Sequence, residues 1–290
     1  MAQLLNAMTI DVEDYFHVSV FDGVVRREDW PIQTSRVVAN TTRLLDVLAE
    51  HGVLATCFVL GWVAERYPSL VKAIAAAGHE VASHGYWHRL VYSQTPDEFR
   101  EDLRRARQVI EDAAGTRVHG YRAPSFSITD RSLWALDILA EEGYDYDASV
   151  FPIRHDRYGL PDAPRHMFRV GGGSLIEAPG SAVRLGGTNL PVAGGGYFRL
   201  LPYAWTRWGI NRLNRVDQLP AIFYLHPWEI DPEQPRLQAG ALGRFRHYRN
   251  LHLTEQRLRS LLSDFRFTRL ADILPDEPPT AELARPSLVA

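Results

Sequence analysis

The chain has 290 residues, of which 46% are hydrophobic and 23% charged, and its formal net charge is −3. This is the composition of a globular protein, and the length allows one large domain or two small ones. The balanced charge gives no argument for a nucleic-acid partner or a membrane surface. The one cysteine, Cys57, excludes an intramolecular disulfide and a multi-cysteine zinc site.

No apolar run reaches the ~18 residues of a membrane span. The first residues, Met-Ala-Gln-Leu-Leu-Asn, lack the basic start and the long apolar region of a signal peptide. We therefore expect a cytoplasmic protein.

Strand-like and helix-like segments alternate through the first half of the chain. Short apolar runs predict strands over residues 8–12, 54–60, 79–83, 118–121 and 144–148. Apolar residues at helical spacing, with Pro near first turns and Gly after last turns, predict helices over residues 34–51, 64–77, 95–114 and 129–142. This alternation is typical of parallel strands wrapped by helices, so we expect an α/β fold, a distorted (β/α) barrel with about seven parallel strands.

The second half is less regular. Strands are expected at 175–178, 221–225 and 267–270, a helix at 254–263, loop at 151–164, and a long excursion over the barrel mouth at 227–250. The glycine clusters at 171–173 and 194–196 lack the spacing of a phosphate-binding loop and are interpreted as turns. We find no linker, so residues 1–275 are predicted to form one domain with a C-terminal extension from about residue 151, and residues 276–290 a flexible tail.

Three acids, Asp11, Glu13 and Asp14, lie at the C-terminal end of the first predicted strand. Acids this close repel one another unless a cation or an arginine lies among them. His84 and His88 follow the third predicted strand with the i, i+4 spacing that commonly holds a divalent metal. Two histidines and one carboxylate leave open positions for water and substrate, which suits metal-assisted hydrolysis.

Two readings of the metal carboxylate remain open. Strand alternation puts Glu13 on the same face as Asp11. A turn beginning after Val12 would favour Asp14, and we give Asp14 a slight preference while keeping both.

Two more chemical side chains follow predicted strands. Arg122 lies in Tyr-Arg-Ala-Pro-Ser-Phe, where Pro124 biases Ala123 toward an extended conformation and so stiffens the turn. His226 ends the apolar run 221–225. Taken alone, Arg122 is as well explained as a surface arginine, and His226 as well explained as a buried core histidine, as either is by a functional role. A barrel carries its chemistry at the C-terminal ends of its strands, and four such ends bear these groups, which favours a functional site.

This order of motifs resembles the polysaccharide deacetylase family, the NodB-type carbohydrate esterases. The resemblance implies that Asp11 is the general base, that His84 and His88 bind metal, and that Arg122 orients the base. It also implies that the backbone N–H of Ser125 helps to hold the oxyanion.

The same resemblance implies that His226 is the general acid, oriented by Asp147 in Tyr-Asp-Tyr-Asp-Ala-Ser. The sequence around these motifs, including Gly-Gly-Gly-Tyr-Phe-Arg and Tyr-Leu-His-Pro-Trp-Glu, is similar to the sequences of a branch of the family found with exopolysaccharide and exosortase systems. One departure is Gly85, which stands where the family usually has Ser or Thr, so a hydrogen bond that steadies a ligand is missing.

The implied activity is hydrolysis of N-acetyl groups from a hexosamine-containing exopolysaccharide or its precursor, with a divalent metal, Zn²⁺ being the expected ion. The implied partners are the N-acetylated glycan and other exopolysaccharide synthesis proteins. Aromatic side chains are placed to contact sugar or acetyl groups, although we expect at least half to be core: Tyr15, Phe16, Tyr86, Trp87, Phe126 and Trp228. Two alternatives remain: hydrolysis of another amide, such as a cyclic ureide or imide, and a non-catalytic glycan-binding barrel in a synthesis complex.

Overall fold

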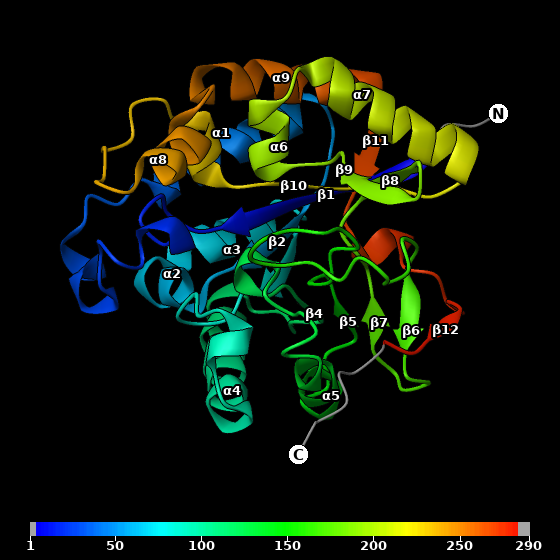
Figure 1. The fold of residues 1–290 in the computed structure, drawn as a ribbon. Coiled ribbons are helices and arrows are strands. Elements are labelled where there is room, and N and C mark those ends of the chain that lie inside the picture. Colours follow the sequence, from blue (N-terminus) through cyan, green and yellow to red (C-terminus); the bar gives the residue numbers. More distant parts are fainter. Residues whose placement is uncertain (1–3, 284–290) are drawn as a thin grey trace.

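The computed structural model describes residues 4–283, and its centre is a curled, mostly parallel sheet (Figure 1). Seven parallel strands follow one another in the order β10-β1-β2-β3-β4-β5-β7. They are β1 (Leu5–Val12), β2 (Thr56–Val59), β3 (Glu80–Ser83), β4 (Gly120–Tyr121), β5 (Tyr146–Asp147), β7 (Ile176–Glu177) and β10 (Ile222–Leu225). The sheet is open between its two edges, so the fold is a half-barrel, and the predicted α/β barrel class is confirmed.

Three further strands extend this sheet. β6 (Phe168–Val170) runs antiparallel to β7, and β12 (Thr280–Ala281) pairs with β6. β11 (Arg266–Thr268) pairs with the first residues of β1. Residues 280–281, which the sequence predicts to be part of a flexible tail, thus belong to the sheet; residues 284–290 lie outside the described part of the chain. A separate hairpin joins β8 (Ala182–Leu185) to β9 (Thr188–Pro191).

Strand β1 lies inside the sheet, and seven of its eight residues are buried. A strand covered on both faces reads as a near-continuous apolar run, which is why Met8 to Val12 is visible in the sequence. Helices cover the sheet (Figure 1). They are α1 (Val37–Glu50), α2 (Gly61–Arg66), α3 (Pro68–Ala76), α4 (Pro96–Ala114), α5 (Trp134–Glu141), α6 (Gly195–Leu200), α7 (Tyr203–Arg212), α8 (Ala241–Tyr248) and α9 (Leu251–Asp264).

The local chemistry explains most helix limits. Thr95 and Glu98 form a reciprocal capping box at the start of α4, and Gly115 ends that helix with φ +70°. The predicted helix over 64–77 is divided in two, because Pro68 starts α3 as its first residue.

The glycine cluster at 194–196 begins α6 instead of forming only a turn. Gly194 has φ +103°, and a Cβ built there would lie 2.4 Å from the Tyr224 carbonyl oxygen, so the close approach to β10 requires glycine. Within residues 4–283, no helix combines the length and the apolar character needed to cross a membrane.

Candidate metal and acid–base site

The register of the sheet brings the chemical residues to one edge. Val12 pairs with Val59, Val59 with Ser83, and Ser83 with Tyr121. The residues that follow these strand ends include Glu13, His84 and Arg122, so the parallel arrangement sets them side by side. On the other side of β1, Ile10 pairs with Leu225, which puts Asp11 level with His226.

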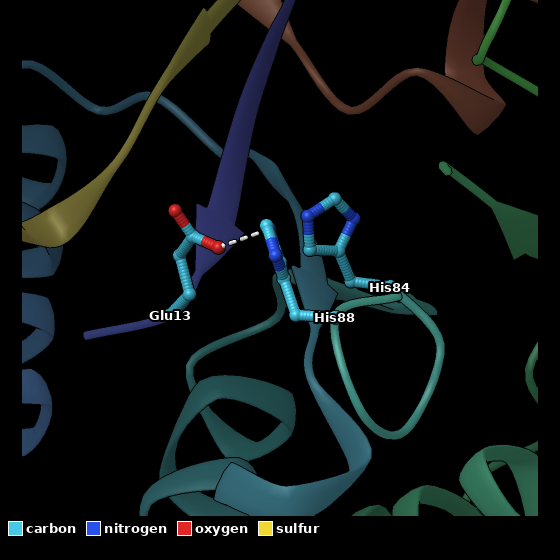
Figure 2. Close-up of side chains that lie close together, drawn as sticks. All are labelled: Glu13, His84 and His88. Atoms are coloured by element: carbon cyan, nitrogen blue, oxygen red, sulfur yellow. Dashed lines mark ion pairs between the residues drawn. The ribbon is translucent and has the colours of Figure 1, made fainter. Parts of the chain in front are cut away.

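Glu13, His84 and His88 form a cluster whose candidate ligand atoms all lie within 4.8 Å of one another. Figure 2 shows the three side chains pointing toward a common point, with Glu13 at the end of β1. Glu13 Oε2 lies 2.7 Å from His88 Nε2. The three side chains are buried, so water cannot satisfy them freely.

The protonation of His84 suits a metal ligand. Its Nδ1 lies 2.8 Å from the Arg122 carbonyl oxygen, which can only accept, so Nδ1 carries the proton and Nε2 keeps its lone pair. Burial lowers the pKa of His84 to about 4, although the carboxylate of Asp11 opposes this. The ring is therefore neutral at physiological pH.

Asp14 has a different task. Its Oδ2 accepts hydrogen bonds from the Ser35 hydroxyl at 2.7 Å and from the backbone N–H groups of Arg36 and Val37 at 2.8 and 3.1 Å. Its Oδ1 accepts from the Tyr15 N–H at 3.0 Å. Asp14 thus caps the start of α1, where an anion is favoured. The geometry favours Glu13 as the metal carboxylate and corrects the preference for Asp14.

Paired substitutions separate these two roles. Glu13→Gln is expected to lose most bound metal, because a neutral amide is a poor ligand. Asp14→Asn is expected to keep the metal but to lower the free energy of unfolding by about 1–3 kcal/mol, because it weakens charged hydrogen bonds to buried donors. Elemental analysis and denaturant unfolding of both variants check this, and metal loss in Asp14→Asn alone would reverse the assignment.

The loop from His84 to His88 is held from α4. Asp102 accepts hydrogen bonds from the backbone N–H groups of Tyr86 and Trp87, at 2.7 and 3.1 Å. Gly85 has φ +71°, and a Cβ built there would lie 2.8 Å from the Asp102 carboxylate. A side chain at residue 85 would crowd this carboxylate, so glycine suits the position. Asp102 thus gives the loop the support that the sequence alone suggests is missing.

We expect Asp102→Asn to weaken metal binding by roughly 10–100-fold, the usual cost of losing a group that orients ligands. The asparagine can accept one of the two N–H bonds but not both. Glu101→Gln is the matched control, because its side chain is exposed on the same helix. Metal titration of both variants checks the prediction, and equal affinities would show that the loop holds its shape without Asp102.

Arg122 and Asp11 form a buried ion pair. The Arg122 guanidinium, whose side chain is 1% exposed, donates to Asp11 Oδ1 and to Thr9 Oγ1, both at 2.7 Å. Its Nε donates to the Ala148 carbonyl at 3.2 Å, and its charge lies 4.2 Å from the Phe58 ring centre. The arginine thus fixes the carboxylate of Asp11, whose Oδ2 remains available to face His226.

Ser125 occupies a strained position after this arginine. Ser125 has φ +53° and Phe126 φ +52°, a left-handed conformation that non-glycine residues seldom adopt. Such strain is often found at functional sites. The Ser125 hydroxyl lies 2.9 Å from that of Ser19. A role for its backbone N–H in holding an oxyanion stays a prediction.

The carboxylate that pairs with His226 is Glu229, which lies three residues further along the chain after β10. Its Nδ1 lies 2.9 Å from Glu229 Oε2, while its Nε2 faces Asp11 Oδ2 at 3.7 Å and Glu13 Oε1 at 3.8 Å. Burial would lower the pKa of His226, but the three carboxylates outweigh burial and raise it to about 9. The side chain of His226 is 18% exposed, against 4% for Asp11 and 2% for Glu13, so it is the most solvent-accessible of these three groups.

Arg199 completes this arrangement from α6. Its Nε donates to Glu229 Oε1 at 2.6 Å, and one terminal nitrogen donates to the carbonyls of Arg246, His247 and Arg249, at 2.9, 2.9 and 3.0 Å. Burial would raise the pKa of Glu229, but Arg199 and His226 lower it to about 2. The buried Glu229 is therefore ionised.

Asp147 lies elsewhere. It accepts from the Ser149 hydroxyl, which in turn accepts from the Ala123 N–H at 2.7 Å, and it interacts with Glu177. Burial raises the pKa of Asp147 to about 6 and that of Glu177 well above its usual value, so this pair holds a proton at neutral pH. The prediction that Asp147 orients His226 is corrected: the contact belongs to Glu229, and Asp147 supports the turn after Arg122.

The aromatic candidates are mostly core. Five of the six are buried, with exposed fractions of 7% or less: Tyr15, Phe16, Tyr86, Phe126 and Trp228. Trp228 donates its indole N–H to Glu13 Oε1 at 3.2 Å and stacks between His226 and His247, at 5.1 and 4.2 Å between ring centres. It supports the site instead of offering a free surface to sugar. Trp87 is half-buried, and its ring lies 4.7 Å from that of Tyr86.

Sequence reasoning missed Glu229 and Arg199. One signal was present: Glu229 follows His226 by three residues, the spacing of a capping box, and here its carboxylate also accepts from the His226 N–H at 3.0 Å. For Arg199 the only signal was its position at the end of the sequence Gly-Gly-Gly-Tyr-Phe-Arg. Its contact with Glu229 depends on how the second half of the chain folds.

The half-barrel therefore carries a Glu-His-His cluster beside the facing Asp11 and His226, which is the arrangement of a candidate metal and acid–base centre. Residues 28–146 match the family model described as polysaccharide deacetylase, and residues 148–275 match a domain of unknown function, DUF3473. The first half of the chain is thus similar to the polysaccharide deacetylase family.

Parts of the chain are similar to proteins named as deacetylases. The chain is 35% identical over 98 residues to a peptidoglycan-N-acetylglucosamine deacetylase of Bacillus cereus, covering 33% of this chain and 36% of that protein. It is 30% identical over 150 residues to a chitooligosaccharide deacetylase of Rhizobium leguminosarum bv. trifolii, covering 50% and 61%. The alignments thus span about a third to three-fifths of these relatives.

One solved structure matches along nearly the full length. It is a Mycobacterium smegmatis protein assigned provisionally as a polysaccharide deacetylase, with a TM-score of 0.63, 22% identity and coverage of 99% of this chain and 100% of that one. At this identity the likeness establishes the fold.

Proposed function

We propose that this protein is a metal-dependent N-deacetylase acting on a hexosamine-containing exopolysaccharide or its precursor. The observation that carries the proposal is the meeting of two sets at one sheet edge: the Glu13, His84 and His88 cluster, and Asp11 facing His226 at 3.7 Å. Two relatives are named as deacetylases, one of peptidoglycan N-acetylglucosamine and one of chitooligosaccharides, and these names support the choice of substrate class.

A divalent cation fits the cluster. His88 Nδ1 is a buried atom without a hydrogen-bond partner among the described residues, Glu13 Oε2 has only His88 Nε2 beside it at 2.7 Å, and His84 keeps Nε2 unprotonated. Two histidines and a carboxylate are the donor set of several catalytic zinc sites, so Zn²⁺ is the ion we propose. When bound, it would supply Lewis-acid polarisation of the acetyl carbonyl and acidify a water.

Asp11 and His226 divide the proton transfers. Asp11, oriented by Arg122, would accept a proton from the attacking water, as a general base must lie within reach of that proton. His226, kept cationic by Glu229, would donate to the nitrogen of the leaving amine. The products are acetate and a free amino sugar, and the proton taken at Asp11 is balanced by the one given at His226.

Metal removal gives the direct test. Protein treated with a chelator is expected to release no acetate from a panel of N-acetylated oligosaccharides, and protein reloaded with Zn²⁺ is expected to release it with free amines in equal amount. His84→Ala should bind little metal and stay inactive after reloading. Undiminished activity after verified metal removal would overturn the metal-dependent mechanism.

The same panel addresses the alternatives. Zinc-loaded protein that binds the oligosaccharides without releasing acetate would favour a glycan-binding barrel. Turnover of a cyclic ureide or imide, with none of the glycans hydrolysed, would favour another amide substrate.

A further inference from the structure

The outward face of α8 carries large apolar side chains. Leu242 is 62% exposed and Phe245 is 54% exposed. Three residues apart, they lie on one face of the helix. A surface helix normally turns polar side chains toward water, so two large exposed apolar residues on its outer face call for a partner.

Arginines surround this apolar pair. Arg236, Arg244, Arg246 and Arg249 are all exposed, and residues 234–250 contain no Asp or Glu, so this segment carries a charge of +4 in a chain whose total is −3. Arg246 lies 3.9 Å from an Asp156 carboxylate oxygen. Within residues 4–283, no carboxylate lies at ion-pair distance from the other three. The overall charge therefore hides a local basic and apolar face.

A pocket lies within this face. Arg236, Arg244, Phe245 and Tyr248 are among the residues that line about 580 Å³ of space. The Arg236 guanidinium lies 4.3 Å from the Tyr248 ring centre, and the Arg249 guanidinium 5.6 Å from that of Phe245. The pocket is thus lined by both cationic and apolar groups, and a phosphate-bearing headgroup could enter it.

The inner face of α8 is already used. His247 stacks on Trp228 at 4.2 Å, and Gly243 packs so closely on Val20 that an added Cβ would lie 2.4 Å from its side chain. Arg199 binds three carbonyls at the end of the helix. The helix is therefore held rigidly beside the candidate site, and Leu242 and Phe245 are not needed to bury its core face.

We propose that this outward face of α8 docks the protein on an anionic lipid surface. The arginines would meet lipid phosphates, and Leu242 and Phe245 would enter the boundary between headgroups and acyl chains, as in interfacial helices with a basic polar face. A second copy fits less well, because a two-fold contact would bring identical sets of arginines together. His247 of α8 stacks on Trp228, which in turn stacks on His226, so docking here would hold the candidate site close to the membrane surface.

Vesicle sedimentation tests this inference without any enzyme assay. The full chain is expected to bind vesicles of phosphatidylglycerol and phosphatidylcholine, to bind pure phosphatidylcholine vesicles weakly, and to be released by raised salt. The double variant Leu242→Ser, Phe245→Ser is expected to bind the anionic vesicles about tenfold or more weakly. The double variant Arg236→Gln, Arg244→Gln is expected to bind the anionic vesicles no better than it binds pure phosphatidylcholine vesicles.

Val216→Ser is the matched control, because Val216 is also 62% exposed but lies beyond α7. It should bind like the unchanged chain. Failure of the unchanged chain to bind anionic vesicles, or unchanged binding by the Leu242 and Phe245 double variant, would overturn the proposal. Concentration-dependent dimers lost in that double variant, or an acidic oligosaccharide retained by this face without vesicle binding, would assign it to another occupant. None of these results depends on whether the site deacetylates glycans.

Discussion

Asp11→Asn is expected to lower turnover ~10²–10⁴-fold while metal content stays unchanged, the usual worth of a general base. The carboxylate is held by Arg122 at 2.7 Å, and its other oxygen faces His226. Asn keeps an acceptor for the buried guanidinium, so the arginine is not left wholly unpaired, but an amide cannot take a proton at neutral pH. Acetate release, elemental analysis and circular dichroism on one preparation check the three parts of this expectation.

Asp46→Asn serves as the control for Asp11, because its side chain is exposed on α1. We expect it to have ordinary activity. If Asp11→Asn is folded, metal-loaded and fully active, the base must be another group. If it loses metal, Asp11 takes part in the metal site and the division between Asp11 and Glu13 fails.

The sequence predicts the half-barrel well because its strands are buried on both faces. Continuous apolar runs such as residues 8–12 and 221–225 mark strands, and parallel pairing brings their ends together. Hence Asp11, His84, Arg122 and His226 could be expected at one edge without knowing any contact. What could not be expected was the choice between Glu13 and Asp14, because it depends on Ser35, Arg36 and Val37 some twenty residues away.

The support of the site was beyond sequence reasoning for the same reason. Asp102 looks like any acid on α4 until the fold brings it under the His84 loop. Asp147 stands in the expected order, but its carboxylate is taken up by Ser149 and Glu177. Arg199 and Glu229 come from the less regular second half, where local periodicity gives few guides to which segments meet.

His226→Ala is expected to leave metal content and folding intact and to cut amide turnover by ~10²–10⁴-fold. An amine is a poor leaving group unless it is protonated, so the loss should be much smaller for activated acetate esters. His252→Ala is the control, because His252 is an exposed histidine on α9. An equal loss on amide and activated ester would instead make His226 a structural or substrate-binding residue.

Glu229→Gln refines this prediction through pH. The Glu229 carboxylate raises the pKa of His226, so its removal lowers that pKa. A general acid works only when protonated, and activity falls as the pH rises through its pKa. The alkaline limb of the profile should therefore move to lower pH in Glu229→Gln and be absent in His226→Ala. Glu229→Asp should restore part of the shift, because it keeps the charge that favours imidazolium, whereas a purely structural role for Glu229 would lower activity by the same factor at every pH.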